Sequence, residues 1–177
     1  VVAHLDAKFD GDHTTALTIM QELPELAPNG RNWIQARVWV SDKHVELCAD
    51  EIVSKCARMN ARHFYNENNP DKGSTYRMLM AKFKAAGHTI NTAKKSDEYN
   101  YQERQNKQYK IQTHLLHHWQ NIHWDMIQSD RKAIDQVCDY QEGAEPDDMP
   151  DSMASLLRCF YDDTVPKNKG LSFFLPR

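Results

Sequence analysis

Apolar residues along most of the chain recur at intervals of three and four positions, which is the spacing of an amphipathic helix. After Asp12, which is a suitable N-terminal helix cap, this spacing continues to Leu23, and Pro24 then ends the run. A shorter run of the same character, Val1–Lys8, comes before it. The pattern predicts two short helices joined at Gly11-Asp12, which make a helical hairpin at the start of the chain.

The next apolar segment has two halves that differ in pattern. The second half, Val45–Met59, follows the helical spacing and has Asp42 as a potential cap. The first half, Ile34–Val40, alternates between apolar residues and polar or aromatic ones, as a strand would. The pattern alone leaves helix and strand open for this half. We favour a helix, because the chain offers no obvious partner strand.

Three further stretches have helical patterns. Thr75–Gly87 is a short apolar run with a glycine at its end, and residues 88–142 contain no Gly or Pro, so this span should hold two or more helices. Ser129 or Asp130 is a suitable cap for one of them. Residues 151–163 follow the helical spacing at every apolar step and predict a final helix.

These elements predict an all-α protein of antiparallel helical hairpins. Apolar positions of the first hairpin fall on those of the next at a shift of 33 residues, which is typical of stacked helical repeats. We expect a single helical domain over 1–163, a short α-solenoid-like stack that continues into an irregular bundle. Its parts are two hairpins in 1–65, a third hairpin with long helices in 75–142, and the helix 151–163. Residues 164–177 lack a period and predict an extended arm.

Two stretches resemble a known repeat family. TYRMLMAKFKAAG, Thr75–Gly87, resembles the first helix and turn of a pentatricopeptide repeat, and VVAHLDAKFDGDHTTALTIMQEL resembles a complete hairpin of that family. The resemblance covers the first half to two-thirds of the chain. Pentatricopeptide proteins read single-stranded RNA through a small polar side chain in the first helix of each repeat. The corresponding positions here are Arg77 and, near the start, His4, so the resemblance favours protein contact over base reading.

Composition narrows the cellular setting. Hydrophobic residues make up 40% of the 177 positions, and mean hydropathy is -0.77. No apolar run in the sequence approaches the roughly 20 residues that span a bilayer, so we expect no membrane insertion. The four cysteines are scattered in apolar patterns, as free buried thiols in a reducing compartment are. A start at Val1 suggests removal of a targeting segment. We therefore expect the mitochondrial matrix side.

Charge is distributed unevenly and predicts a contact surface. Residues 77–110 contain eight basic and three acidic residues, whereas residues 139–163 contain eight acidic residues and one basic residue. Basic and tyrosine side chains interleave before residue 110, which suits an acidic protein partner or single-stranded nucleic acid. The C-terminal arm adds two adjacent phenylalanines. The predicted partner-binding residues are Lys94, Lys95, Tyr99, Tyr101, Arg104, Lys107, Tyr109, Phe173 and Phe174.

Signals of catalysis are few. Gly-x-Ser-x-Gly and the phosphate-binding Gly-x-x-x-x-Gly-Lys are absent from the sequence, and the spacing of the acidic residues in the last third singles out no catalytic pair. His114 and His118 lie one helical turn apart and could form half of a metal site, but the stripe of Leu115 and Trp119 beside them fits ordinary boundary positions of a helix. We expect no cofactor.

The sequence therefore predicts a non-catalytic accessory subunit of a larger protein assembly. The pentatricopeptide-like accessory subunits of some mitochondrial ATP synthases are similar precedents implied by the resemblance. Two alternatives stay open: an organellar RNA-binding repeat protein, and a metal-dependent enzyme that uses the histidine-rich helix.

Overall fold

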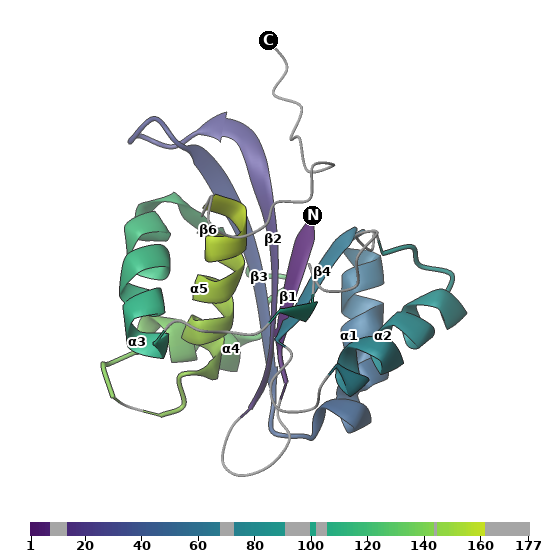
Figure 1. The fold of residues 1–177 in the computed structure, drawn as a ribbon. Helices are drawn as coiled ribbons and strands as arrows, with labels where there is room; N and C mark the ends of the chain where they lie inside the picture. The colour runs from purple at the N-terminus through teal and green to yellow at the C-terminus, as the bar shows by residue number, and fades with distance from the viewer. Residues whose placement is uncertain (8–13, 68–72, 91–99, 102–105, 144, 162–177) are drawn as a thin grey trace.

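The computed structural model describes residues 1–7, 14–67, 73–90, 100–101, 106–143 and 145–161. A six-stranded sheet in the order β5-β4-β1-β2-β3-β6 has helices on both of its faces (Figure 1). The strands are β1 (Val2–Asp6), β2 (Thr15–Leu26), β3 (Asn32–Ser41), β4 (His63–Glu67), β5 (Asn100–Tyr101) and β6 (Ile122–Trp124).

Strands β1, β2 and β3 form an antiparallel meander in the middle of the sheet. The outer strands are parallel to their inner neighbours: β4 to β1, β5 to β4, and β6 to β3. A parallel neighbour requires a long crossover connection. Helix α1 lies in the connection from β3 to β4, and helix α2 lies in the connection from β4 to β5.

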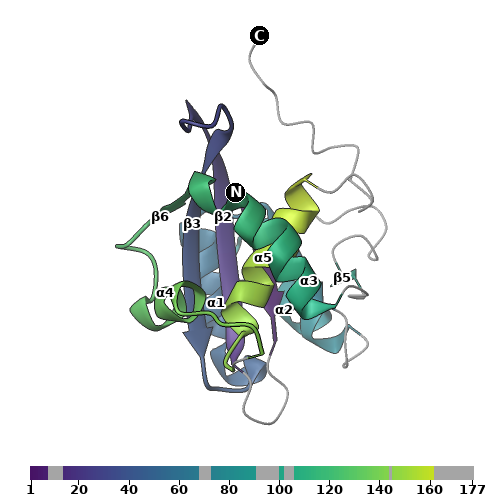
Figure 2. The same cartoon turned by 90° about the vertical axis from the view of Figure 1, so that its left-hand side faces the viewer.

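The helices separate into two groups. Helices α1 (Val45–Arg58) and α2 (Ser74–Ala85) cover one face of the sheet, and α3, α4 and α5 cover the other (Figures 1 and 2). Helix α3 (Lys107–Lys110) continues into a π-helix, Ile111–Leu116, and a 3₁₀ turn, Trp119–Asn121. The remaining helices are α4 (Arg131–Cys138) and α5 (Asp148–Tyr161).

The prediction of an all-α protein is wrong, because the fold is mixed α/β. The hairpin predicted for the first residues of the chain consists of strands β1 and β2. Every residue from Ala16 to Met20 is buried, since helices cover both faces of the sheet. A strand that is buried on both faces has a continuous apolar sequence rather than an alternating one. The positions of such a run also satisfy a helical spacing.

The helix favoured for Ile34–Val40 is also wrong, because this segment lies in β3 and pairs with β2. Its partner strand, β2, lies in the run whose apolar spacing predicts a helix. Predicted helices are confirmed at α1, α2, α4 and α5. The predicted arm, residues 164–177, lies outside the described residues.

Apolar side chains from the sheet and both helical layers form one core cluster. On the α1 and α2 side, Ile52 and Phe83 are buried, and the rings of Phe64 and Phe83 meet edge to face with centroids 5.3 Å apart. On the other side, Met153 and Leu157 of α5 are fully buried. Helix α5 packs across β1 and β2, so its position is fixed by the middle of the sheet.

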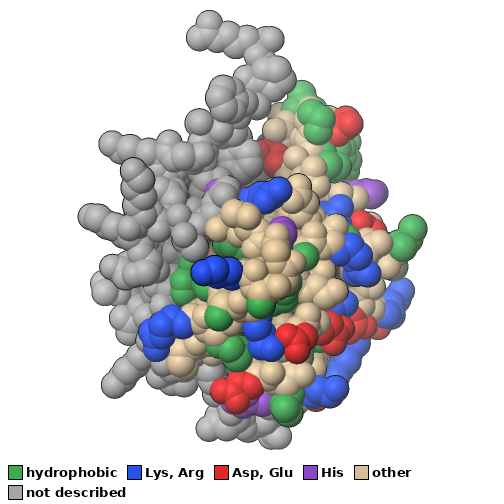
Figure 3. Space-filling view, turned by 90° about the vertical axis from the view of Figure 1, so that its right-hand side faces the viewer, with side chains coloured by type: hydrophobic (Ala, Val, Ile, Leu, Met, Phe, Trp, Pro, Cys, Tyr) green, Lys and Arg blue, Asp and Glu red, His purple; other side chains and the backbone are tan. Residues whose placement is uncertain are grey.

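The outer surface of helices α1 and α2 is polar and carries charges of both signs. Basic and acidic side chains intersperse over its described residues (Figure 3). An ion pair between Lys82 and Asp50, 2.6 Å from Nζ to Oδ1, connects the two helices. Across the described parts of the chain, no helix combines the length and apolar character needed to span a membrane.

Candidate functional site

Two neighbouring parallel strands each end with an acidic residue. Asp6 is the last residue of β1, and Glu67 is the last residue of β4. The register pairs Leu5 with Asn66, so the two strands end at the same edge of the sheet. Ligands of open α/β sheets bind outside the carboxyl ends of the strands. This edge is therefore the first place to look for a functional site.

Helix α5 brings two more carboxylates to this edge. Asp148 is the first residue of α5, and its Oδ2 accepts hydrogen bonds from the backbone N–H (2.6 Å) and the hydroxyl (2.9 Å) of Thr14. Thr14 directly precedes β2, in which Ala16 pairs with Asp6. The start of α5 thus lies beside the end of β1. Asp151 follows Asp148 by three residues and projects from the same side of the helix.

Two lysines of α3 face these carboxylates. Lys107 Nζ lies 2.6 Å from Asp147 Oδ1 and 4.0 Å from Asp148 Oδ1. Burial alone would lower the pKa of Lys107, but the hydrogen bond to Asp147 and the negative charges of Asp147, Asp151 and Asp6 outweigh it and raise this pKa. Asp6 is near these groups, because its partner Ala16 follows Thr14, which hydrogen-bonds Asp148, by two residues. We call Asp6, Asp147, Asp148, Asp151, Lys107 and Lys110 the acidic cluster.

The ion pair between Lys110 and Asp151 is the most deeply buried part of the acidic cluster. Lys110 Nζ lies 2.9 Å from Asp151 Oδ1, and the two side chains are 1% and 7% exposed. Burial raises the pKa of Asp151 despite the opposing effect of Lys110 and Lys107. Charged groups are rarely buried to this extent unless a structural or functional constraint holds them there.

A polar network beside the acidic cluster holds α5 on the sheet. His4 Nδ1 of β1 lies 2.9 Å from Ser152 Oγ of α5, and the Thr18 hydroxyl of β2 donates to the same oxygen at 3.0 Å. Burial, followed by the charges of Lys110 and Arg158, lowers the pKa of His4 well below its ordinary value, so the ring is neutral at pH 7. The network therefore holds α5 in a fixed position relative to β1, the strand that ends with Asp6.

The chemistry of the acidic cluster fits a hard divalent cation. Four carboxylates and two ammonium groups sum to a charge of -2, and carboxylate oxygens are the ligands of Mg²⁺ and Mn²⁺. Within the described ranges, no three His, Cys, Asp or Glu side chains stand as a ready-made metal group. Mg²⁺ does not require one, because it is usually bound by one or two carboxylates together with substrate phosphates. Asp6 and Asp148 could hold such an ion together with a substrate phosphate, whereas Asp151 is already paired with Lys110.

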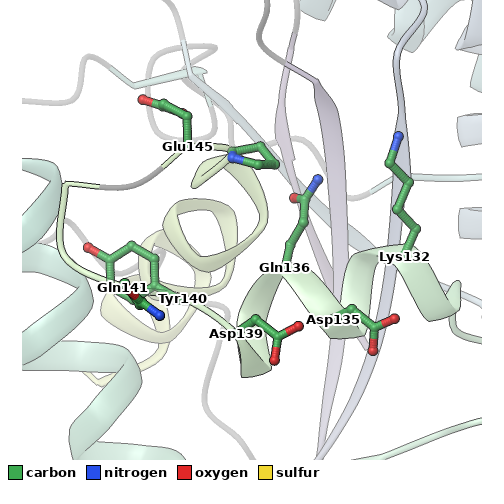
Figure 4. Close-up of a pocket in the computed structure, with 8 residues that line it drawn as sticks. Lys132, Asp135, Gln136, Asp139, Tyr140, Gln141 and Glu145 are labelled. Atoms are coloured by element: carbon green, nitrogen blue, oxygen red, sulfur yellow. The ribbon is translucent and has the colours of Figure 1, made fainter.

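A pocket of about 530 Å³ lies next to α4 and is a weaker candidate. Figure 4 shows Lys132 and Gln136 on one side of α4 and Asp135 and Asp139 on the opposite side. Asp135 is paired with Arg131, and Lys132 is paired with Asp42, so these charges are already balanced. The pocket offers no nucleophile next to a base.

The sequence-predicted contact residues are only partly described. Six of them, Lys94, Lys95, Tyr99, Arg104, Phe173 and Phe174, lie outside the described residues. Tyr101 is in the short strand β5. Lys107 belongs to the acidic cluster, whereas Tyr109 is 57% exposed. Within the described part of the predicted surface, Lys107 is thus directed toward carboxylates of its own chain.

The two histidines considered for a metal do not form such a site in the described part of the chain. His114 is in the π-helix, and His118 follows it, buried, with its ring 5.0 Å from that of His117. Burial, followed by the positive charges of His117, Arg31 and His114, lowers the pKa of His118 to about 4. No group of three metal-binding side chains includes either residue there.

Sequence reasoning missed Asp6, Asp148 and Asp151. Two local signals were present: an Asp-x-x-Asp pair at the start of α5 and a Lys-x-x-Lys pair in α3. Each pair places two like charges on one helix face. Neither signal identifies the other as its partner, because the two helices are separated by about 40 residues in sequence.

No family model, no curated protein and no solved structure matches the chain. The resemblance to pentatricopeptide proteins stays a prediction that these comparisons do not test.

Proposed function

We propose that the protein is an enzyme that hydrolyses phosphodiester bonds of a nucleic acid with the help of divalent cations. The observation that carries the proposal is that the start of α5 lies beside the end of β1: Asp148 accepts a hydrogen bond from Thr14, two residues before Ala16, and Ala16 pairs with Asp6. Asp6 and Asp148 are the proposed ligands, together with phosphate oxygens of the substrate. The sequence analysis predicted no cofactor, so the proposed divalent cation departs from that expectation.

The arrangement supplies what phosphodiester hydrolysis needs. A divalent cation bound by these carboxylates would lower the pKa of a water molecule and neutralise charge on the phosphate. Lys107 stands at the rim of the acidic cluster, with its side chain 36% exposed, and can meet a phosphate oxygen. Buried, ionised groups beside the site act without the reorganisation that water requires.

A nucleic acid is the favoured substrate because of what precedes α3. Basic and tyrosine residues are interleaved from Lys94 to Lys110 in the sequence, a composition that suits a phosphate backbone with stackable bases. The last two lysines of this segment, Lys107 and Lys110, belong to the acidic cluster. RNA is therefore one substrate to test, and a repeat protein that binds RNA without cleaving it stays a separate prediction from the sequence.

A nuclease assay tests the proposal. The purified protein is incubated with plasmid DNA or single-stranded RNA, with Mg²⁺, Mn²⁺ or EDTA. We expect cleavage that needs the cation and that falls at least about 100-fold in Asp6→Asn, because one charge at the reacting centre is lost. Asp135→Asn, on the outer side of α4, is the matched control and should keep full activity. Absence of cleavage with either cation, or equal cleavage by Asp6→Asn, would refute the proposal.

The non-catalytic subunit remains the second candidate, and one observation favours it. Large apolar side chains are exposed around the 3₁₀ turn and β6: Leu116, Trp119, Met126 and Ile127, the last with an exposure of 90%. Such a group is a common feature of protein contacts. An inactive protein that co-purifies in fixed ratio with a partner from mitochondria would support this candidate and its predicted location.

A further inference from the structure

Strand β6 forms an open edge of the sheet. Figure 2 shows it beside β3, and no described element lies beyond it. The N–H of Asp125, directly after β6, donates to the carbonyl of Ala36 in β3 at 3.0 Å. Because the backbone groups of successive residues alternate between the two sides of a strand, those of Ile122 and Trp124 point away from β3.

Three of these outward backbone groups are available to another strand. The N–H of Ile122 is already bonded to the carbonyl of Trp119. The carbonyl of Ile122 and both the N–H and the carbonyl of Trp124 make no backbone hydrogen bond on their outer side to any described residue. A strand edge of this kind is a template for pairing with another chain.

Large apolar side chains flank both ends of β6. Leu116 and Trp119 come before the strand and are 56% and 38% exposed, and Met126 and Ile127 follow it and are 55% and 90% exposed. The rings of Trp119 and Trp124 meet edge to face with centroids 6.2 Å apart, so the apolar surface continues from the 3₁₀ turn onto β6. We call Leu116, Trp119, Met126 and Ile127 the apolar edge group. A group of exposed apolar side chains around an open strand edge marks an interaction surface.

The segment that carries the apolar edge group is nearly free of charge. Residues 111–128 contain one Asp and no Glu, Lys or Arg, although charged residues make up 27% of the chain. That residue, Asp125, pairs with Arg37 at 2.9 Å, and the two side chains are only 16% and 12% exposed. Exposed strand edges are commonly protected by Lys or Pro, and β6 contains neither. Such a surface offers no charge to an acidic or basic partner and meets no like charge on an identical copy.

We infer that β6 pairs with β6 of a second copy of this chain, so that the two sheets join across a two-fold axis. The inference goes beyond the proposed function and does not depend on it. With the two strands antiparallel and the axis at His123, the N–H of Trp124 donates to the carbonyl of Ile122 in the second copy, and the axis repeats this bond. The start of each strand then lies beside the end of the other. The apolar side chains before β6 therefore face those after β6 of the second copy, and one surface supplies both halves of the interface.

Sedimentation equilibrium over a range of protein concentrations tests the pairing. The wild type should be in equilibrium between monomer and dimer. Ile127→Lys should weaken dimerisation at least about tenfold, because it would bury a charge among apolar side chains. Ile127 is 90% exposed in the single chain, so this variant should fold normally. Leu47→Lys, on α1 and 76% exposed, is the matched control and should leave dimerisation unchanged.

A cysteine on the two-fold axis tests the register. Residues that face each other in a non-hydrogen-bonded antiparallel pair have Cα atoms about 4.5 Å apart, which is within the range of a disulfide. His123→Cys should therefore form a disulfide-linked dimer under mild oxidation. The background is Cys138→Ser, since Cys138 is the exposed member of the described free cysteines. Leu47→Cys in the same background is the control and should cross-link much more slowly.

Each outcome decides the inference. Concentration-dependent dimers that are weakened in Ile127→Lys and cross-linked through His123→Cys would establish it. A wild type that stays monomeric at millimolar concentration would overturn it, also where another protein binds to this edge. Dimers that persist in Ile127→Lys, or that cross-link equally through Leu47→Cys, would overturn it as well. None of these measurements uses nuclease activity, so this inference and the proposed function can fail separately.

Discussion

The two faces of the sheet differ in how deeply their charged side chains are buried. Under α1 and α2 the core cluster is apolar, and the ion pair that joins these two helices, Lys82–Asp50, lies outside, with the aspartate 88% exposed. Under α3 and α5 the charges lie inside, with Lys110 and Asp151 almost completely buried. Burying an ion pair costs desolvation energy that its attraction often does not repay. The α1 and α2 face therefore serves mainly to support the sheet. The other face contains buried charged groups that cost desolvation energy, and we propose a chemical role as the reason that they are kept.

The largest expected effect on stability is on the α5 face. Asp151→Ala would leave the Lys110 ammonium buried without this carboxylate, and removal of one partner from a buried pair costs about 3–5 kcal/mol. The free energy of unfolding, measured with urea, should fall by this amount. A loss below about 1 kcal/mol would mean that the pair is effectively solvated, and it would remove the contrast between the two faces.

Acidification should act on the same face. The pKa of His4 is well below its ordinary value in the folded state, so the unfolded chain binds a proton more readily. His4 therefore contributes stability that is present above the unfolded pKa of about 6.5 and is lost as the pH falls below it toward the folded pKa. The fall in melting temperature below pH 6.5 should be smaller in His4→Gln than in the wild type.

A second histidine adds to this acid sensitivity. The pKa of His118 is lowered to about 4, so its contribution is lost between about pH 6.5 and pH 4. His118→Gln is the variant to compare with His4→Gln over this range. Identical pH profiles for the wild type and both variants would contradict the assigned origin of the acid sensitivity.

The smallest effect is expected on the α1 and α2 face. Lys82→Met removes an ion pair whose partner is mostly in solvent, and exposed pairs contribute about 0–1 kcal/mol. Urea unfolding should therefore differ from the wild type by less than about 1 kcal/mol. A loss as large as that of Asp151→Ala would show that the two faces do not differ in the way described.

The sequence predicted elements that are amphipathic and capped locally. Helix α1 has the predicted buried stripe, but its N-cap is His44 and not the predicted Asp42, whereas Asp130 caps α4 through its side chain as the pattern indicated. Strands β1 and β2 failed because helices cover both of their sides, which removes the alternation that marks a strand. Ile34–Val40 did alternate, but its partner strand was not recognised.

The candidate site was beyond local patterns for a different reason. Asp6 and Asp148 are 142 positions apart, and only the pairing of β1 with β2 and the packing of α5 on these strands bring them together. An all-α prediction contains no sheet edge at which they could meet. Once the strand ends are known, the acidic residues at the end of β1 and at the start of α5 become a recognisable group.

The most direct test of the central claim is the position of Mn²⁺ in crystals grown or soaked with this ion. We expect an anomalous peak within bonding distance of carboxylate oxygens of Asp6 and Asp148, and its loss in Asp6→Asn. A peak at His114 or His118 instead, or none in crystals soaked with both Mn²⁺ and a short nucleic acid, would contradict the account of the acidic cluster as the catalytic centre.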